Sequence, residues 1–418
     1  MKRFSLRSML LFFAVIGPGV ITAAADNDAG GIMTYVVAGA KYKFDMLWIL
    51  VIITFVLAMI QEMCARMGVV TQKGLGELIR ENFGVKWTMF ALGVLLIANL
   101  ATTVAEFAGL AASTEIFGIS RYISVPICAI GIWLLIVKGT FKTVERVFLA
   151  LTVLYGTYVI SGIMAHPHWL DVFHNVVSPH FTSRNVSPNF LFLAIAVIGT
   201  TITPWMQFFL QATVVDKGIK LENYKYQKWD VYIGSLMTDV VSFFIVVSAA
   251  IMIYQANHGP VDLKSPAEAA VALKPFAKGY AEALFAVGLF NASLLAAAVL
   301  PLSTAYTYCE SFGWEIGVSR RLKEAPMFFG IYTLSIIFGA AVVLLPDIGL
   351  IDTMIRAQAI NGILLPVILI FMLKLINSKE IMGKHTNTKI YNIAVWGMAI
   401  VLILMTLGSL VGAILGYS

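Results

Sequence analysis

Apolar stretches long enough to cross a lipid bilayer follow one another along almost all of this 418-residue chain. A transmembrane helix needs about 20 predominantly apolar residues. Eleven stretches meet this condition, namely 10–40, 45–68, 87–118, 122–138, 144–164, 188–214, 229–254, 279–311, 326–345, 350–375 and 390–415. Only 12% of the residues are charged, against roughly 25% in a soluble domain. The sequence therefore predicts an all-α integral membrane protein that forms a single transmembrane domain over residues 1–418.

The basic residues are distributed unevenly between the predicted loops. If the N-terminus is placed in the cytoplasm, 20 Lys and Arg residues fall in cytoplasmic loops and seven in outer loops. This bias predicts a cytoplasmic N-terminus and an extracellular C-terminus. The net charge of +6 then reflects topology and does not indicate nucleic-acid binding. The compact loops and the lack of targeting signals favour a bacterial inner membrane, in which the lipid bilayer is the expected partner.

Motifs of other protein classes are missing from the predicted spans. Cys64, Cys128 and Cys309 have no paired spacing, so we expect free thiols rather than disulfides or a zinc site. No His-Glu-x-x-His motif or nucleophile-base pair occurs in the spans, which argues against a membrane-embedded enzyme. We expect neither a cofactor nor an obligate protein partner.

Two of the apolar stretches are interrupted. The first contains Asp-Asn-Asp-Ala-Gly-Gly at 26–31, and the sixth contains Gly-Thr-Thr-Ile-Thr-Pro at 199–204. Irregular backbone at membrane depth is tolerated where it lines a cavity, and an acid there usually marks an ion path. Two broken spans at corresponding positions of two halves point to the binding site of a transporter.

The positions of the two breaks also predict the internal symmetry. Five spans separate them, so the second half enters the membrane in the opposite orientation. This arrangement is an inverted five-plus-five repeat, with 10–164 as the first repeat, 188–375 as the second and 390–415 as an eleventh helix.

Several motifs resemble the Nramp family of divalent metal transporters. These are Gly-Pro-Gly at 17–19, the break at Asp28 and QEMCARMGVVTQKGLGE at 61–77. The resemblance continues through Glu106 in the third span, Glu145 in the fifth, the second break, and Gln358 eight residues before Pro366. It covers nearly the whole chain and implies a LeuT-like fold that works by alternating access.

The chain departs from the family pattern in three of its spans. Asp-Pro-Gly-Asn is replaced by Asp-Ala-Gly-Gly, so the amide ligand is lost at Gly31. Met-Pro-His is replaced by Thr203-Pro204-Trp205, and an Asp is replaced by Thr103. Loss of the soft thioether favours the hard ions magnesium, calcium and manganese. A wide site also suits a partly hydrated ion. This pattern is similar to the magnesium-transporting branch of the family, so we expect Mg²⁺, or else Mn²⁺, as the transported substrate.

The resemblance implies which residues form the metal site. Asp28 supplies the negative charge of the site. Backbone groups come from Gly31 and from the carbonyls near Ala25 and Thr200. Side-chain groups come from Thr203 and Gln358. Supporting or pathway residues are Asp26, Gly30, Thr103, Glu106, Glu145, Pro204 and Trp205.

The sequence also indicates whether protons move together with the metal ion. All six histidines lie outside the predicted spans, and His is the side chain that usually titrates near working pH. Only Glu106 and Glu145 remain of the groups expected on a proton route. We therefore expect uncoupled import of the metal ion. The alternative is a proton-coupled importer of manganese or iron. A sodium-coupled amino-acid transporter is disfavoured because Asp28 would repel a substrate carboxylate.

Some of the site residues also have a structural interpretation. Asp28 could cap a helix, and Thr203 could bond a carbonyl freed by Pro204. Glu106 could be a hydrogen-bonding acid without a place in the path. Asp26 could either add charge near the site or face the outer vestibule.

Other patterns lead to separate expectations. The spacing of four residues predicts ion pairs between Glu62 and Arg66 and between Asp352 and Arg356. Met206 should point away if a helix resumes after Pro204, whereas Met33 remains open as a sulfur ligand. Asp239 has no motif around it, and the histidines at 166, 168, 174 and 180 should decorate a solvated loop.

Overall fold

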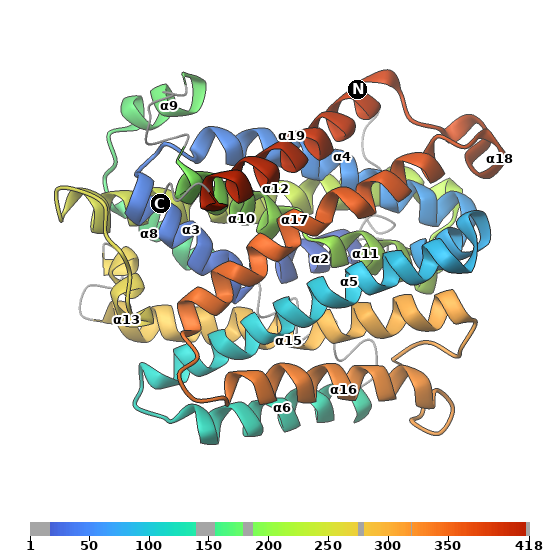
Figure 1. Ribbon diagram of the computed structural model, residues 1–418, viewed down its shortest axis with the longest axis horizontal. Helices are drawn as coiled ribbons and strands as arrows, with labels where there is room; N and C mark the ends of the chain where they lie inside the picture. The colour runs from blue at the N-terminus through green and yellow to red at the C-terminus, as the bar shows by residue number, and fades with distance from the viewer. Residues whose placement is uncertain (1–16, 139–154, 179–186, 275–279, 319, 415–418) are drawn as a thin grey trace, which may run out of the picture.

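The computed structural model describes residues 17–138, 155–178, 187–274, 280–318 and 320–414, and its regular structure in these ranges is helical throughout. The long helices run roughly along the longest axis of the molecule (Figure 1). Helices α6 (Arg121–Lys138) and α16 (Pro326–Val343) lie side by side along one edge, while α19 (Lys389–Ile414) packs against α10 (Pro188–Thr201) and α17 (Leu350–Ile376).

The remaining elements follow the predicted order of two halves. The first half also contains α2 (Pro18–Asp26), α3 (Ala29–Tyr42), α4 (Leu47–Thr71), α5 (Leu75–Glu115) and α8 (Gly156–Met164). The second also contains α11 (Pro204–Asp216), α12 (Tyr224–Ala249), the π-helix η4 (Ala250–Gln255) and α15 (Ala281–Phe312). Short helices in the loops are α9 (Trp169–Val177), η3 (Leu221–Asn223), α13 (Pro266–Ala269), η5 (Ala270–Leu273), α18 (Lys379–Met382) and η7 (Gly383–His385).

Among the described residues, nine helical stretches are long and apolar enough to cross a membrane, and the second broken span, Pro188–Asp216, counts as one of them. The first broken span, made of α2 and α3, is not among the nine. The fifth predicted span, 144–164, lies partly outside the described residues. Eleven spans therefore remain a prediction, whereas the all-helical fold with two broken spans is confirmed.

The third predicted span, 87–118, corresponds to the part of α5 that follows a break in the helix. α5 begins at Leu75, and Gly84 interrupts it with φ 74° and ψ 177°, a non-helical conformation that favours glycine. The helical segment before Gly84 carries Glu77, Arg80 and Glu81 and was not predicted from the sequence, because its charges interrupt the apolar pattern.

Helix α12 holds both halves of the first broken span through very close backbone contacts. A Cβ atom on Gly234 of α12 would lie 2.7 Å from the carbonyl oxygen of Gly19 in α2. A Cβ atom on Gly39 of α3 would lie 2.4 Å from the carbonyl oxygen of Val246 in α12. Small residues allow such approaches between membrane helices, so α12 fixes where the first break lies.

A buried carboxylate anchors the beginning of α2 to the same helix. Asp230 accepts hydrogen bonds from the backbone nitrogens of Gly17 at 3.1 Å, Gly19 at 2.6 Å and Val20 at 3.3 Å. The first N–H groups of a helix lack partners within the helix. Asp230 therefore acts as a cap supplied by another helix.

We predict that Asp230→Ala lowers the free energy of unfolding by about 3 kcal/mol, because hydrogen bonds to a charged group contribute about 1.5–3 kcal/mol each. Asp230→Asn, which keeps one acceptor oxygen, should cost less. Thermal unfolding of the purified protein in detergent measures both. The control is Asp262→Ala, since Asp262 is 81% exposed in its ion pair with Lys41. Equal effects of the Asp230 and Asp262 variants would contradict the anchoring role.

Candidate functional site

The two breaks leave particular backbone carbonyls without their helical partners. The carbonyl of Thr200 would normally accept from the N–H of residue 204, but Pro204 has none. The carbonyl of Ala25 would accept from Ala29, but the Ala29 N–H donates to Glu106 Oε2 at 3.1 Å. Both carbonyls lie at C-terminal helix ends, which carry partial negative charge. These are the two carbonyls predicted from the sequence.

Asp28 combines a structural role with a place in the site. It is the N-cap of α3, and its Oδ1 accepts from the Gly31 nitrogen at 2.5 Å. Its two carboxylate oxygens also accept from Gln358 Nε2 at 3.1 and 3.0 Å. The residue is 1% exposed. The capping interpretation of Asp28 is therefore confirmed, and the cap lies within a buried polar cluster.

Oxygen atoms surround the position where Gly31 lacks a side chain. A Cβ atom built there would lie 2.8 Å from Thr200 Oγ1, 3.0 Å from Asp28 Oδ1 and 3.3 Å from the carbonyl oxygen of Asp26. The hydroxyls of Thr200 and Thr203 are buried, and neither has a hydrogen-bond partner among the residues that the structure describes. Thr203 therefore does not repair an upstream carbonyl. Hard oxygen ligands gathered in this way suit Mg²⁺, Ca²⁺ or Mn²⁺.

Gln358 reaches the first break because α10 and α17 touch through their backbones. A Cβ atom on Gly199 would lie 2.2 Å from the carbonyl oxygen of Gln358, and one on Gly30 would lie 2.1 Å from Gln358 Nε2. The glycines thus create the space for this side chain. The amide nitrogen faces Asp28, whereas a metal ligand would have to present the amide oxygen. In this arrangement Gln358 is a hydrogen-bond donor to Asp28.

The predicted supporting residues differ in their positions. Glu106 lies beside Asp28, close enough for the two carboxyl groups to share a hydrogen bond when one of them is protonated. Thr103 does not join the cluster, because its hydroxyl donates to the Asn99 carbonyl at 2.7 Å and its methyl group packs against Gly339. Pro204 occupies the start of α11, as predicted. Glu145 lies outside the described residues.

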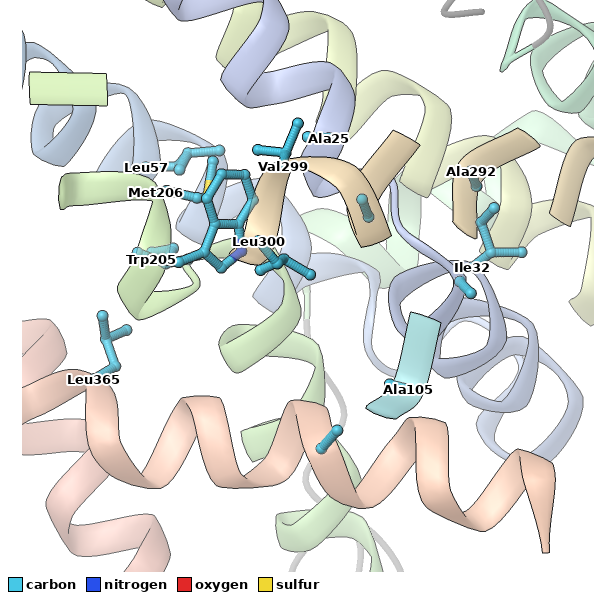
Figure 2. Close-up of a cluster of buried hydrophobic side chains, with 14 of the residues drawn as sticks. Ala25, Ile32, Leu57, Ala105, Trp205, Met206, Ala292, Val299, Leu300 and Leu365 are labelled. Atoms are coloured by element: carbon cyan, nitrogen blue, oxygen red, sulfur yellow. The ribbon is translucent and has the colours of Figure 1, made fainter. Parts of the chain in front are cut away.

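The aromatic and sulfur-containing side chains near the second break belong to the apolar core. Figure 2 shows the Trp205 indole among Leu300, Val299 and Met206. Met33 and Met206 are both buried members of the hydrophobic core. The expected direction of Met206 is consistent with this packing.

Four buried acids gather around the first break without cationic partners. Asp26, Asp28, Glu106 and Asp239 are each at most 3% exposed, and within the described residues none of them pairs with Lys, Arg or His. Asp26 lies near both Asp28 and Asp239, so it does not face an open vestibule. Among the described residues no hydrogen bond of normal geometry reaches either carboxylate oxygen of Asp239, although the Thr54 side chain lies next to it.

The remaining expectations have mixed outcomes. Glu62 and Arg66 form the predicted ion pair at 3.2 Å, and the three cysteines are unpaired. The ion pair between Asp352 and Arg356 was predicted wrongly, because no contact within 4.0 Å joins these two described residues. The described outer histidines (His166, His168 and His174) are exposed, and His180 lies outside the described residues. No group of three metal-binding His, Cys, Asp or Glu side chains occurs among the residues described.

Sequence reasoning missed a buried polar chain next to Gln358. Asn361 Nδ2 donates to Gln358 Oε1 at 2.9 Å and to Thr102 Oγ1 at 2.8 Å. A signal was present, since Asn361 lies three residues after Gln358 and therefore on the same side of a helix. Polar side chains at this spacing in an apolar span indicate a shared network.

Comparison with known proteins gives one family match and several structural matches. The family model for natural resistance-associated macrophage protein-like proteins, Nramp, matches residues 19–412. The Eremococcus coleocola manganese transporter, solved with an aromatic bis-isothiourea substituted compound, has a TM-score of 0.76 and 20% identity over 99% of this chain and 88% of that chain.

Two other transporters share the fold at lower similarity. MhsT in complex with L-phenylalanine has a TM-score of 0.60 and 16% identity, covering 94% of this chain and 98% of its own. Mhp1, a nucleobase-cation-symport-1 family transporter, has a TM-score of 0.57 and 14% identity, covering 96% and 91%. These matches establish the LeuT-like fold of this chain.

We predict that Gly31→Ala weakens binding of the transported cation at least about tenfold, or 1.4 kcal/mol. The new Cβ atom would lie 2.8 Å from Thr200 Oγ1 and must displace one of the surrounding oxygens. Calorimetric titration of the purified protein with Mg²⁺ or Mn²⁺ measures the change. Gly93→Ala is the control, because a Cβ atom there meets nothing within 4 Å. Unchanged affinity in Gly31→Ala would place the cation elsewhere.

We also predict that Asp239→Leu raises the melting temperature by a few degrees. Burial of a carboxyl group without hydrogen-bond partners costs about 1–3 kcal/mol, and Asp239 borders a cavity of about 190 Å³ lined largely by apolar residues. Differential scanning fluorimetry in detergent tests this, with Asp262→Leu as the exposed control. A lower melting temperature would instead mean that the Asp239 carboxylate holds a stabilising partner.

Proposed function

Because this chain belongs to the Nramp family and is therefore a multi-pass membrane transporter rather than an enzyme, we propose that it imports hard divalent cations, above all Mg²⁺. The cation would bind between the two broken spans and reach the cytoplasm by alternating access. Mn²⁺ would be accepted at the same site. The metal ion is the transported substrate, and no separate cofactor takes part.

The observation that carries this proposal is the ring of oxygen atoms around the Gly31 position. Asp28 Oδ1, Thr200 Oγ1 and the Asp26 carbonyl converge on one small space. Asp28 supplies the negative charge, and the freed carbonyls of Ala25 and Thr200 add further acceptors. A cation that binds there meets hard ligands only, and this favours magnesium, calcium and manganese over softer transition metals.

The small number of protein ligands supports magnesium in particular. Mg²⁺ gives up its water reluctantly and is usually held through one or two carboxylates with several waters retained. Gly31 leaves room for such water because it has no side chain. Thr203 can bind the ion directly or through a water. Met33 and Met206 are core residues, which supports a site without sulfur.

We propose that the membrane potential alone drives uptake. An inside-negative potential is worth about 2.3 kcal/mol per elementary charge per 100 mV, so a divalent cation gains roughly twice that. The excess of 20 cytoplasmic over seven outer basic residues supports a cytoplasmic N-terminus and an extracellular C-terminus. A bacterial inner membrane is the proposed location, and its inside-negative potential would favour uptake into the cytoplasm.

The second candidate is a proton-coupled importer of manganese or iron. Glu106, Asp26 and Asp239 favour it, since they are buried acids without cationic partners and could carry protons. The structural match to a manganese transporter also favours it. This candidate differs from the first in predicting that protons move with the metal.

The deciding experiment is metal flux into proteoliposomes with an imposed inside-negative potential and an internal pH indicator. We expect Mg²⁺ uptake that rises with the potential and causes no acidification. Asp28→Asn should reduce uptake at least about 100-fold, because it removes the charge that replaces part of the hydration shell.

The control variant is Asp262→Asn, which changes an exposed carboxylate and should leave uptake unchanged. Manganese uptake with inward proton flow and no magnesium uptake would support the second candidate. Full activity of Asp28→Asn would overturn the proposed site for both.

A further inference from the structure

A chain of buried amides connects the proposed cation site with the helices behind it. Gln358 Nε2 donates to both oxygens of Asp28, at 3.1 and 3.0 Å. Gln358 Oε1 accepts from Asn361 Nδ2 at 2.9 Å, and the same nitrogen donates to Thr102 Oγ1 at 2.8 Å. The side chains of Gln358, Asn361 and Thr102 are fully buried. The orientation of the Gln358 amide is therefore tied to that of the Asn361 amide.

This orientation places the amide nitrogen of Gln358, rather than its oxygen, toward the proposed cation site. An ionised carboxylate only accepts hydrogen bonds, so it is the amide nitrogen of Gln358 that faces Asp28. A cation binds an amide oxygen and not an amide nitrogen. For Gln358 to become a ligand, its amide must turn over and present Oε1 to the site. Nε2 would then face Asn361 Nδ2, and these two donors would oppose each other unless the Asn361 amide turned as well. The Thr102 hydroxyl allows that second turn, because it lies 2.8 Å from Asn361 Nδ2 and 3.2 Å from Asn361 Oδ1. Gln358 can therefore turn only together with Asn361.

We propose that Asn361 is a specificity-determining residue that keeps the Gln358 oxygen out of the cation site. With Gln358 held in place, a bound ion keeps a water where an amide oxygen would otherwise bind. This favours ions that retain their water, such as Mg²⁺, over ions that exchange water readily for protein ligands, such as Mn²⁺. The inference rests on the proposed function, because it assumes that the cation binds at Asp28.

The consequence is that removing Asn361 should change selectivity rather than destroy binding. In Asn361→Leu the hydrogen-bond donor is gone while the side-chain volume is nearly kept, so Gln358 can turn its oxygen toward the ion. We expect Mn²⁺ affinity to rise about tenfold relative to Mg²⁺, the effect of about one hydrogen bond on an equilibrium. Asn361→Asp should act in the same direction, because a carboxylate accepts from Gln358 Nε2 and turns Oε1 outward.

The experiment is titration of the full-length purified protein with Mg²⁺ alone and with Mn²⁺ alone, in a double-mutant cycle. Asn361→Leu is measured in the natural chain and in the Gln358→Ala variant, where it should have no effect on the ratio of affinities. Asn99→Leu is the matched control. It also removes a buried amide on a neighbouring helix, since Asn99 Nδ2 donates to Thr304 Oγ1 at 2.8 Å, but it leaves Gln358 untouched.

The outcomes separate this inference from the proposed function. An equal change for both ions in Asn361→Leu, or the same change when Gln358 is absent, would overturn the specificity role. If Asn361→Leu does not fold, the same comparison is made with Asn361→Asp. Metal binding that is unchanged in Asp28→Asn would instead overturn the proposed site, and the inference with it.

Discussion

Hydrogen bonding of the backbone at the two breaks governs the site, because no solvent satisfies such groups within a membrane. At the first break Glu106 accepts from the N–H of Ala29 and Asp28 accepts from that of Gly31, and at the second break Pro204 has no N–H. The carbonyls of Ala25 and Thr200 lose their helical partners because Ala29 bonds elsewhere and Pro204 cannot donate. The breaks therefore leave two carbonyls without helical partners, an arrangement suited to a cation.

Glycines determine the shape of the site, because they let the helices around the two breaks approach closely. Gly19, Gly234 and Gly39 let α12 approach both halves of the first broken span, and Gly199 lets α17 approach α10. Gly31 leaves an oxygen-lined space at the point where these elements meet. The same backbone contacts carry Gln358 to Asp28, so the packing of the bundle and the chemistry of the site depend on the same few close approaches.

Much of the fold was predictable from the sequence because its signals are local. The breaks were placed at 26–31 and 199–204, and Pro204 and the acid run locate them regardless of tertiary structure. The freed carbonyls of Ala25 and Thr200 follow from those positions. Side-chain directions were not predictable in this way. Thr103 turns toward Gly339 instead of the cluster, and the nitrogen of Gln358 faces Asp28, because these orientations depend on contacts with neighbouring helices as well as on bonds within each helix.

Other features were also not predictable from the sequence, because they depend on contacts between elements that are distant in sequence or on side-chain conformation. Spacing alone does not show that Asp352 and Arg356 stay apart, since rotamers and solvent decide whether a pair at this spacing forms. The charged helical segment before Gly84 was not predicted because its polar residues interrupt the apolar run. The link from Asn361 to Thr102 spans 259 residues of sequence, and only the packing of α5 against α17 reveals it.

The most direct test of the account is the number of water molecules on an ion bound at Asp28. Electron-nuclear double resonance of bound Mn²⁺ in heavy water counts these ligands, with displacement by Mg²⁺ confirming a shared site. The account predicts several water ligands, oxygen coordination throughout, and loss of the signal in Asp28→Asn. A bound ion without water ligands, or a signal that survives Asp28→Asn, would contradict it.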